Sequence, residues 1–385
     1  MLRAGRGIKT FADMGMSDID TATEGAVAAP PKICVVRRGA VMNFVLNRPR
    51  ALNAFDDDMR AVLAAEIPRT ARDPDIYIGA FTSASDRAFC AGGDVRALVA
   101  VAKTDMGRAR GMFAAEYQLD WLLDCFSKPT VSLINGLCMG SGAGLTCFNT
   151  HRVAGEKYSF AMPETAIGLF PDVGVSHKLA AMPWPVGLYL GLTGRSITRA
   201  DAYWLGLATH CIPATRFEGI LEALSQAEPV DPLLDGLHED PGRGEVEESL
   251  TLIRDHFSGE TLKEIINALA SATGAAKPWA EKVRQELAAR SPMSLAITDR
   301  HIRSCRALDL RETLFQDYRL AWRCLEGHDF LEGVRAALID KDHAPRWVPA
   351  EIDAIEETEV ARYFEPLGAD DLALPTREQM QAARV

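Results

Sequence analysis

Two glycine-rich turns, each between a predicted strand and a predicted helix, constrain the fold of this chain more than any other feature. The first, at 83–93 (SASDRAFCAGG), follows a strand predicted over 76–82. The second, at 135–144 (NGLCMGSGAG), follows a strand predicted over 129–134. Strands that alternate with helices favour a layered core over an all-helical one. The fold class expected is therefore α/β (α+β).

The pattern changes near residue 195. Before it, the spacing predicts a β-hairpin over 33–46 and helices over 56–67 and 107–126. After it, strand signals nearly vanish and helices follow one another, separated by a segment rich in proline and glycine. The organisation expected is a disordered tail or targeting segment over 1–30, a catalytic core over 31–227, a loop over 228–245 and a helical C-terminal region over 246–385.

Charge and hydropathy exclude some classes of partner. The 385 residues include 42 Lys+Arg and 53 Asp+Glu, a net charge of −11. A generic nucleic-acid binder is usually basic, so no nucleic-acid partner is expected. No apolar run reaches the roughly 18 residues of a membrane-spanning helix, so no membrane partner is expected either. An anionic small ligand is still allowed, because a local basic patch can sit on an acidic protein.

Cysteine and histidine usage bears on compartment and metals. The eight cysteines form no C-x-x-C pair, and the eight histidines show no H-x-x-x-H spacing. We expect free thiols in a reducing compartment and no metal site. The first residues contain Arg3, Arg6 and Lys9 but no acid. The bacterial cytoplasm is the favoured location, with the mitochondrial matrix as the alternative if this segment is a transit peptide.

The two turns are candidate oxyanion-binding elements. Backbone N–H groups at a helix start are unpaired and lie at the positive end of the helix dipole. Two such donors that converge on one carbonyl oxygen would stabilise an oxyanion. Ordinary structural turns are the other interpretation of 88–94 and 139–142. A dinucleotide site is weakly supported by G-x-G alone, and Ser141 lies outside a G-x-S-x-G nucleophile motif.

Two carboxylic acids in an apolar segment are candidate acid–base groups. Glu164 and Asp172 occur in FAMPETAIGLFPDVG, each directly after a proline. Apolar surroundings raise a carboxyl pKa, which suits general acid or base chemistry. Helix capping after proline is the competing explanation for both residues. Glu116, on the helix predicted over 107–126, is by itself most simply a solvated residue.

These motifs, taken in order, resemble the enoyl-CoA hydratase/isomerase (crotonase) superfamily. The resemblance rests on AFCAGGD, NGLCMGSGAG and FAMPETAIGLFPDVG, and it spans about residues 33–363. It implies a spiral of ββα units, an acyl-CoA substrate and an oxyanion hole made by the N–H groups of Gly93 and Ser141. Ser141 stands where the family usually has glycine. The resemblance also implies that substrate is bound by Glu116, Asn53, Ala54, Ala91, Gly92, Asp94 and Gly140.

Within the superfamily, the chain is most similar to the 3-hydroxyisobutyryl-CoA hydrolases. Gly144 replaces the second catalytic glutamate of typical hydratases, and the C-terminal string at 327–336 (GHDFLEGVRA) matches the hydrolases. This implies hydrolysis of a short β-hydroxyacyl-CoA, most simply 3-hydroxyisobutyryl-CoA of valine breakdown. Glu164 would act as nucleophile or general base, and Asp172 would position water or the β-hydroxyl.

The same resemblance implies that no cofactor is needed beyond the CoA of the substrate, and it allows a homo-oligomer. Arg48 or Arg50 would meet the CoA phosphates or lie in solvent. Two other functions stay open. One is enoyl-CoA hydration or isomerisation, and the other is non-catalytic binding of acyl-CoA on the same fold.

Overall fold

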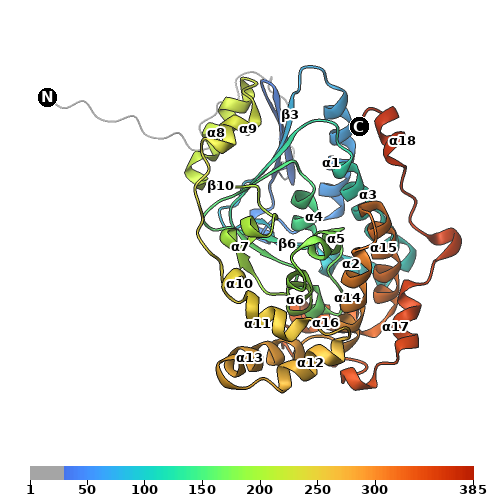
Figure 1. Cartoon of the computed structure of the whole chain (residues 1–385). Helices are drawn as coiled ribbons and strands as arrows, with labels where there is room; N and C mark the ends of the chain where they lie inside the picture. Colours follow the sequence, from blue (N-terminus) through green and yellow to red (C-terminus); the bar gives the residue numbers. More distant parts are fainter. Residues whose placement is uncertain (1–29) are drawn as a thin grey trace. The chain divides into compact units, whose positions relative to one another are not determined.

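The computed structural model describes residues 30–385 (Figure 1). The tail or targeting segment predicted over 1–30 therefore lies almost wholly outside the described residues. Residues 32–385 form one compact unit. None of the helices in the described part of the chain is both long and apolar enough to cross a membrane.

A repeated ββα unit builds the first half of this compact unit. In each repeat the first strand joins a six-stranded sheet of order β1-β2-β3-β5-β7-β10, and the second joins a four-stranded sheet of order β4-β6-β8-β9. This arrangement confirms the predicted spiral of ββα units. The three repeats are β3 (Ile78–Ser83), β4 (Ala88–Cys90) and α2 (Val95–Ala102); β5 (Thr130–Ile134), β6 (Leu137–Met139) and α4 (Ser141–Cys147); and β7 (His151–Ala154), β8 (Ser159–Ala161) and α5 (Val175–Ala181).

The N-terminal hairpin and first helix form largely as their sequence predicts. β1 (Ile33–Arg38) pairs antiparallel with β2 (Val41–Leu46) across the expected turn. The Asp56 carboxylate caps α1 (Asp57–Arg72) by accepting the Met59 N–H. α1 continues five residues beyond its predicted end at 67. Lys128 stabilises that end, because its Nζ donates to the Thr70 carbonyl at 2.8 Å.

The second half is mostly helical, as predicted. The segment 228–245, expected to be a loop, contains α9 (Val230–Asp235), and the short strands β9 (Ile197–Thr198) and β10 (His210–Cys211) extend the sheets after residue 195. These strands are two residues long, too short to give a periodic signal. The remaining helices are α6 (Val186–Thr193), α7 (Arg199–Trp204), α8 (Phe217–Ser225), α10 (Glu245–Glu248), α11 (Leu250–Phe257), α12 (Leu262–Ala270), α13 (Lys277–Ala288), α14 (Pro292–Cys305), α15 (Leu310–Glu326), α16 (His328–Val334), α17 (Glu357–Phe364) and α18 (Arg377–Ala382).

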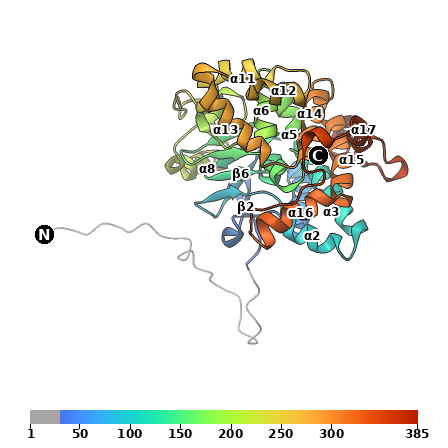
Figure 2. The same ribbon diagram turned by 90° about the horizontal axis from the view of Figure 1, so that it is seen from below.

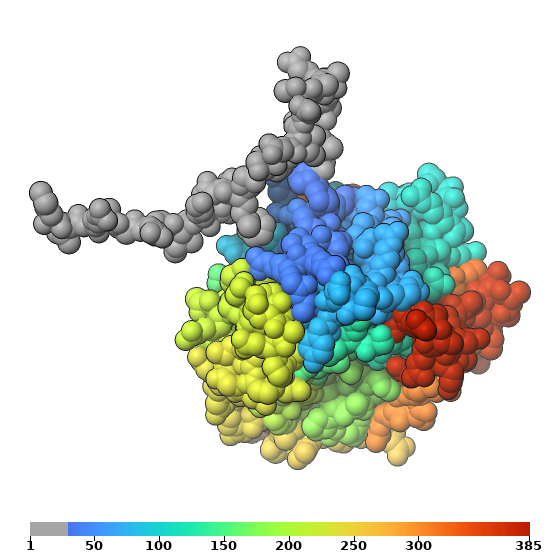
Figure 3. Space-filling model, turned by 90° about the horizontal axis from the view of Figure 1, so that it is seen from above, coloured from blue at the N-terminus to red at the C-terminus, as the bar shows by residue number. Residues whose placement is uncertain are grey.

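Two hydrophobic clusters cover the two faces of the six-stranded sheet. The smaller one joins strand residues such as Val131 and Val153 to Ile220 and Leu224 of α8 and to Leu234 of α9. α9 forms inside the expected loop because its apolar side chains are buried against this face of the sheet. α8 and α9 lie beside the strands in Figure 1, and in Figure 3 their surface (yellow) flanks the N-terminal strands (blue). The larger cluster joins the other face to the helices of both halves.

The C-terminal helices pack against the first half of the unit. α3 (Met106–Asp124) contacts α15 and α2, while α2 contacts α16. Figure 2 shows α16 beside α2 and α3. One chain segment before residue 130 and another after residue 310 therefore meet, and the cavity described next lies partly between them.

Candidate active site

Three neighbouring parallel strands end at the same edge of the four-stranded sheet. β4 pairs with β6, and β6 pairs with β8, both in parallel. Because parallel strands point the same way, the segments that follow them emerge together. These segments are the ends of the two glycine turns, which contain β4 and β6 themselves, and the Pro163–Glu164 step. The sheet thus brings together two motifs that the sequence separates by about 47 residues and a third about 24 residues further on.

Each glycine turn has a backbone amide without a hydrogen-bond acceptor among the described residues. Phe55 forms a bridge with Gly93 by donating its N–H to Gly92 and accepting that of Asp94. This bridge turns the Gly93 N–H to the opposite side. Ser141 begins α4, so its N–H has no partner within the helix. Among residues 30–385 neither N–H meets a hydrogen-bond acceptor.

Small distances show how closely the turns approach. A methyl group placed on Gly93 would lie 3.0 Å from Oγ of Ser141. One placed on Gly140, whose φ is +48°, would lie 3.1 Å from Oε1 of Glu164 and 4.0 Å from the Gly93 nitrogen. Only glycine combines that left-handed backbone with such a close approach. The turns and the glutamate therefore surround one small volume.

This volume opens into a cavity of about 480 Å³. The cavity is where most of the predicted site residues meet. Its apolar lining includes Phe113, Leu169 and Leu338 from three distant parts of the chain. The predicted site residues that line it are Ala91, Gly92, Gly93, Asp94, Glu116, Gly140, Ser141, Glu164 and Asp172.

Asn53 and Ala54, predicted to bind substrate, do not line the cavity. Asn53 is fully buried, and its Nδ2 donates to the Phe89 carbonyl and to Ser83 Oγ, both at 2.8 Å. Its Oδ1 accepts the Arg48 N–H. The Asn53 side chain therefore fixes β4, which lies within the first glycine turn. The local sequence could not reveal this, because the partners of Nδ2 lie 30 and 36 residues away.

Glu164 is a buried carboxyl group that forms no ion pair with any of residues 30–385. It begins a short 3-10 helix (Glu164–Ile167) and is 6% exposed. Its Oε2 has no hydrogen-bond partner among the described residues. Burial, followed by the nearby charge of Asp172, raises the pKa of Glu164 well above its usual range. A carboxylate in such a place is a strong base once ionised.

Asp172 lies in the same cavity and has a donor. The hydroxyl of Tyr117 on α3 donates to its Oδ2 at 2.8 Å. Burial and then the charge of Asp317 raise the pKa of Asp172 to about 8, although the Tyr117 hydrogen bond opposes this. Two neighbouring carboxyl groups with raised pKa values hold a proton near neutral pH. Helix capping, the competing explanation for Glu164 and Asp172, does not account for this burial.

Glu116 differs from both, because it is paired. It projects from α3 into the cavity, and its Oε2 accepts from Nε of Arg60 at 2.8 Å. Arg60 also contacts Asp57, so the guanidinium bridges two carboxylates of different exposure. The expectation that a helix glutamate is solvated is thus wrong for Glu116, which is only 6% exposed.

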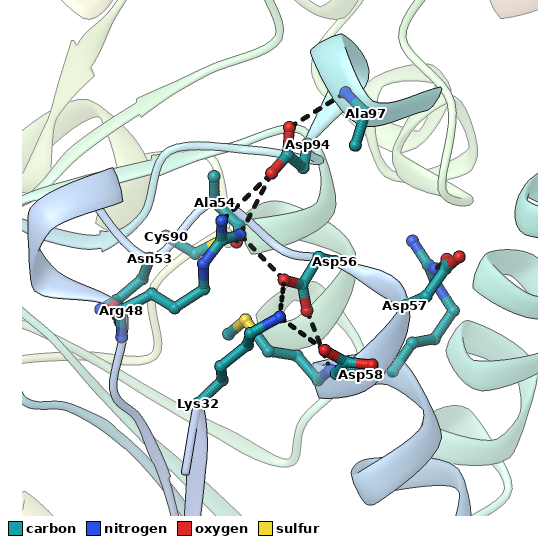
Figure 4. Close-up of polar contacts among 12 residues, drawn as sticks. Lys32, Arg48, Asn53, Ala54, Asp56, Asp57, Asp58, Cys90, Asp94 and Ala97 are labelled. Carbon is teal, nitrogen blue, oxygen red and sulfur yellow. Dashed lines mark hydrogen bonds and ion pairs between the residues drawn. The ribbon is translucent and has the colours of Figure 1, made fainter. Parts of the chain in front are cut away.

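The mouth of the cavity is acidic and internally paired. Arg48 lies between Asp56 and Asp94, with its guanidinium 3.2 Å from each carboxylate, and also donates to the Ala54 carbonyl at 2.6 Å (Figure 4). Lys32 pairs with Asp56 and Asp58 in the same network (Figure 4). Arg48 therefore cross-links the segments on either side of the bridge to Gly93. Arg50 is exposed.

The C-terminal motif packs directly on the 3-10 helix of Glu164. A methyl group on Gly333 would lie 2.4 Å from the carbonyl carbon of Ile167, so α16 and this helix touch through their backbones. Asp329 of α16 accepts from Ser291 Oγ at 2.5 Å, and the Ser291 N–H donates to the Thr165 carbonyl at 3.1 Å. The string at 327–336 thus holds Glu164 in place.

Sequence reasoning missed Arg60, Tyr117 and Asp120. On α3, Asp120 lies four residues after Glu116 and three after Tyr117, and this helical spacing was the only available signal. Asp120 is buried, and its Oδ2 has no partner among the described residues. A methyl group on Gly144 would lie 2.7 Å from Oδ1 of Asp120. The position of the usual second hydratase glutamate therefore has no room for a side chain.

Fold and site together define an enzyme of the α/β class, whose cavity is lined by two glycine turns and a buried glutamate. The chain belongs to the enoyl-CoA hydratase/isomerase family, whose model matches residues 41–364. It is 36% identical to a rat protein named 3-hydroxyisobutyryl-CoA hydrolase, mitochondrial, over 89% of this chain and 90% of that one.

Two solved structures are also similar. One is described as a carnitinyl-CoA dehydratase from Mycobacterium thermoresistibile, with a TM-score of 0.84, 33% identity, and coverage of 89% of this chain and 99% of that one. The other is described as an enoyl-CoA hydratase from Rhodobacter sphaeroides, with a TM-score of 0.83, 33% identity, and coverage of 89% and 100%. Within residues 30–385, no group of three or more His, Cys, Asp or Glu side chains is arranged to hold a metal ion.

Proposed function

We propose that this chain hydrolyses a short β-hydroxyacyl-CoA thioester, with 3-hydroxyisobutyryl-CoA as the favoured substrate. The products are the hydroxy acid and free CoA. The observation that supports this most is the meeting of two unpaired amides with an unpaired buried carboxyl in one cavity. The name of the rat relative supports the choice of acyl group.

In the proposed mechanism the thioester oxygen accepts from the N–H groups of Gly93 and Ser141. The Glu164 carboxylate then attacks the carbonyl carbon and expels CoA thiolate, leaving a mixed anhydride that water hydrolyses. Alternatively, Glu164 removes a proton from water, and the resulting hydroxide attacks the same carbon. In both routes a negative charge develops on the thioester oxygen that the two amides bind. Each N–H donor lowers the free energy of the transition state by about 3–4 kcal/mol.

Asp172 and Glu116 have separate proposed tasks. Asp172, with a pKa raised to about 8 by burial and then by Asp317, holds a proton at neutral pH and donates it to the departing thiolate. Glu116 accepts a hydrogen bond from the β-hydroxyl of the substrate through the oxygen that Arg60 leaves free. The pairing of Arg60 with Oε2 fixes the orientation of this carboxyl group.

Hydration of an enoyl-CoA is the second candidate, favoured by the descriptions of the two similar solved structures. That reaction in typical members uses a second glutamate at the position of Gly144. The closeness of Asp120 and Val173 to Gly144 argues against such a side chain here. A non-catalytic acyl-CoA-binding protein is the third candidate, and the unpaired Glu164 argues against it.

The test is thiol release over an acyl-CoA panel, followed with a thiol reagent. We expect 3-hydroxyisobutyryl-CoA to release CoA fastest, and isobutyryl-CoA, which lacks the β-hydroxyl, to release it slowly. Loss of enoyl absorbance from crotonyl-CoA without free thiol would establish the hydratase alternative instead. Binding of every thioester without any reaction would establish the non-catalytic alternative.

For localisation, the word mitochondrial in the name of the rat relative supports the matrix over the bacterial cytoplasm. The segment that would direct import lies outside the described residues. Fusion of residues 1–30 to a fluorescent protein, with Arg3, Arg6 and Lys9 replaced by glutamine as the control, tests this alternative.

A further inference from the structure

A second group of buried charges lies behind Asp172, outside the cavity. His301 of α14 and Asp317 of α15 are both fully buried, and Nε2 of His301 lies 2.7 Å from Oδ1 of Asp317. Neither residue lines the cavity. Removing two ionisable groups from water carries a large desolvation penalty, and a buried ion pair is often no more stable than an apolar replacement. We therefore expect this pair to have a role other than stabilising the fold.

The pair contacts the loop that carries Asp172 at two points. The Gly174 N–H donates to Oδ2 of Asp317 at 2.8 Å. The His301 ring meets the ring of Phe170 edge-on, with centroids 5.4 Å apart. Asp172 thus lies between two residues that His301 and Asp317 hold.

The backbone of this loop is strained between those points. Val173 has a φ of +52°, a conformation that β-branched residues rarely adopt. Such a conformation persists only where the surroundings enforce it. The hydrogen bond from Gly174 to the Asp317 carboxylate supplies part of that enforcement, since it anchors the residue that follows Val173.

The pair also acts on Asp172 through charge. The groups that face Asp172 are the Tyr117 hydroxyl, the Cys324 thiol and the carboxyl groups of Glu116, Asp120, Glu164 and Asp317. Burial lowers the pKa of His301, but Cys305 and Asp317 outweigh this and raise it to about 10. In its protonated form, His301 offsets part of the charge that Asp317 presents to Asp172.

We propose that Asp317 and His301 are a positioning pair for Asp172. Asp317 holds the Asp172 loop through the Gly174 amide, and the balance of charge within the pair determines the pH at which Asp172 loses its proton. The pair touches neither substrate nor cavity. This proposal rests on the proposed function only for its activity readout, because the titration of Asp172 can be followed without substrate.

Two conservative variants are expected to move that titration in opposite directions. Asp317→Asn removes the negative charge but keeps an oxygen for the Gly174 N–H, so Asp172 should ionise at lower pH. His301→Gln keeps a donor to Asp317 but removes the cation, so Asp172 should ionise at higher pH. A displacement of about one pH unit each way is expected for charges at this range. Asp299→Asn, which removes a buried carboxylate from the same helix as His301, is the matched control and should not move it.

The measurements are the pH profile of kcat/KM for thiol release and the infrared band of the protonated Asp172 carboxyl, assigned with Asp172→Asn. Opposite displacements of both readouts support the pair. Displacements in the same direction, or an unchanged titration in folded variants, overturn it. In the uncharged double variant H301Q/D317N, Asp172 should ionise at lower pH, as in Asp317→Asn. This variant is measured instead if either single variant fails to fold. Absence of thiol release by the unaltered enzyme would refute the proposed function, while the infrared titration would still test the pair.

Discussion

The cavity has two walls, and each carries one glutamate in a contrasting electrostatic state. On the strand wall, at the carboxyl ends of β4, β6 and β8, Glu164 is 6% exposed and its Oε2 has no partner among the described residues. On the helix wall, Glu116 of α3 is equally buried but pairs with Arg60. Two glutamates with the same burial therefore differ in their electrostatic surroundings. Glu116 has a cation beside it, whereas Glu164 has none among the described residues.

The largest expected effect separates the two walls directly. Glu164→Gln should lower kcat for thiol release by at least about a thousandfold while substrate still binds, because it removes the reacting group. Glu116→Gln, the matched variant on the other wall, should mainly raise KM and lower kcat by less than about tenfold. Steady-state kinetics and calorimetric titration measure both. Near-normal CoA release by Glu164→Gln would refute the assignment.

The next effect concerns the amide donors of the strand wall. Ser141→Pro removes the N–H at the first position of α4, where proline is tolerated, and should lower kcat by about a hundredfold or more. Ser141→Gly keeps the N–H and should stay within about tenfold of the unaltered enzyme. Circular dichroism checks that both variants fold. Equal losses in the two variants would show that the Ser141 side chain, and not its amide, matters.

On the helix wall the expected effect is on stability. Arg60→Met leaves Glu116 buried without a cation, which should lower the free energy of unfolding by about 3–5 kcal/mol. Arg69→Met breaks an exposed ion pair with Glu66 on the same helix and should change it by at most about 1 kcal/mol. Urea denaturation compares them. If both variants lose the same stability, the pairing of Glu116 is no different from a surface ion pair.

The smallest effect depends on pH. The pKa of Asp172 is raised to about 8 by burial and then by Asp317, against about 4 in the unfolded chain, so the folded state binds the extra proton. Stability should therefore fall as pH rises between these values. At pH 9 the melting temperature of Asp172→Asn should lie a few degrees above that of the unaltered protein. This difference should shrink toward pH 4. Asp86→Asn, at an exposed position, is the control, and a gap independent of pH would contradict the raised pKa.

Both walls were partly predictable from sequence, for different reasons. The strand wall is made of short motifs, so the glycine turns and Glu164 were identifiable before their meeting point was known. On the helix wall, Glu116 entered only through the family resemblance. Its partner Arg60 lies 56 residues away, and no local pattern links the two. Asn53 also entered through the resemblance, and only the structure shows that its side chain is buried and bonded to Ser83, Phe89 and Arg48.

The sequence by itself determined the local elements: the hairpin, the helix caps, and the two turns in which glycine alone permits a close backbone approach. These depend on neighbouring residues and on backbone sterics, which a short segment contains in full. Only the tertiary structure decided which buried carboxyl is paired, where Arg48 binds, and which charges stand behind Asp172. Asp317 meets the Gly174 amide across 143 residues. The reason is physical, because a pKa depends on burial and on charges within a few ångströms, and the folded chain alone brings those groups together.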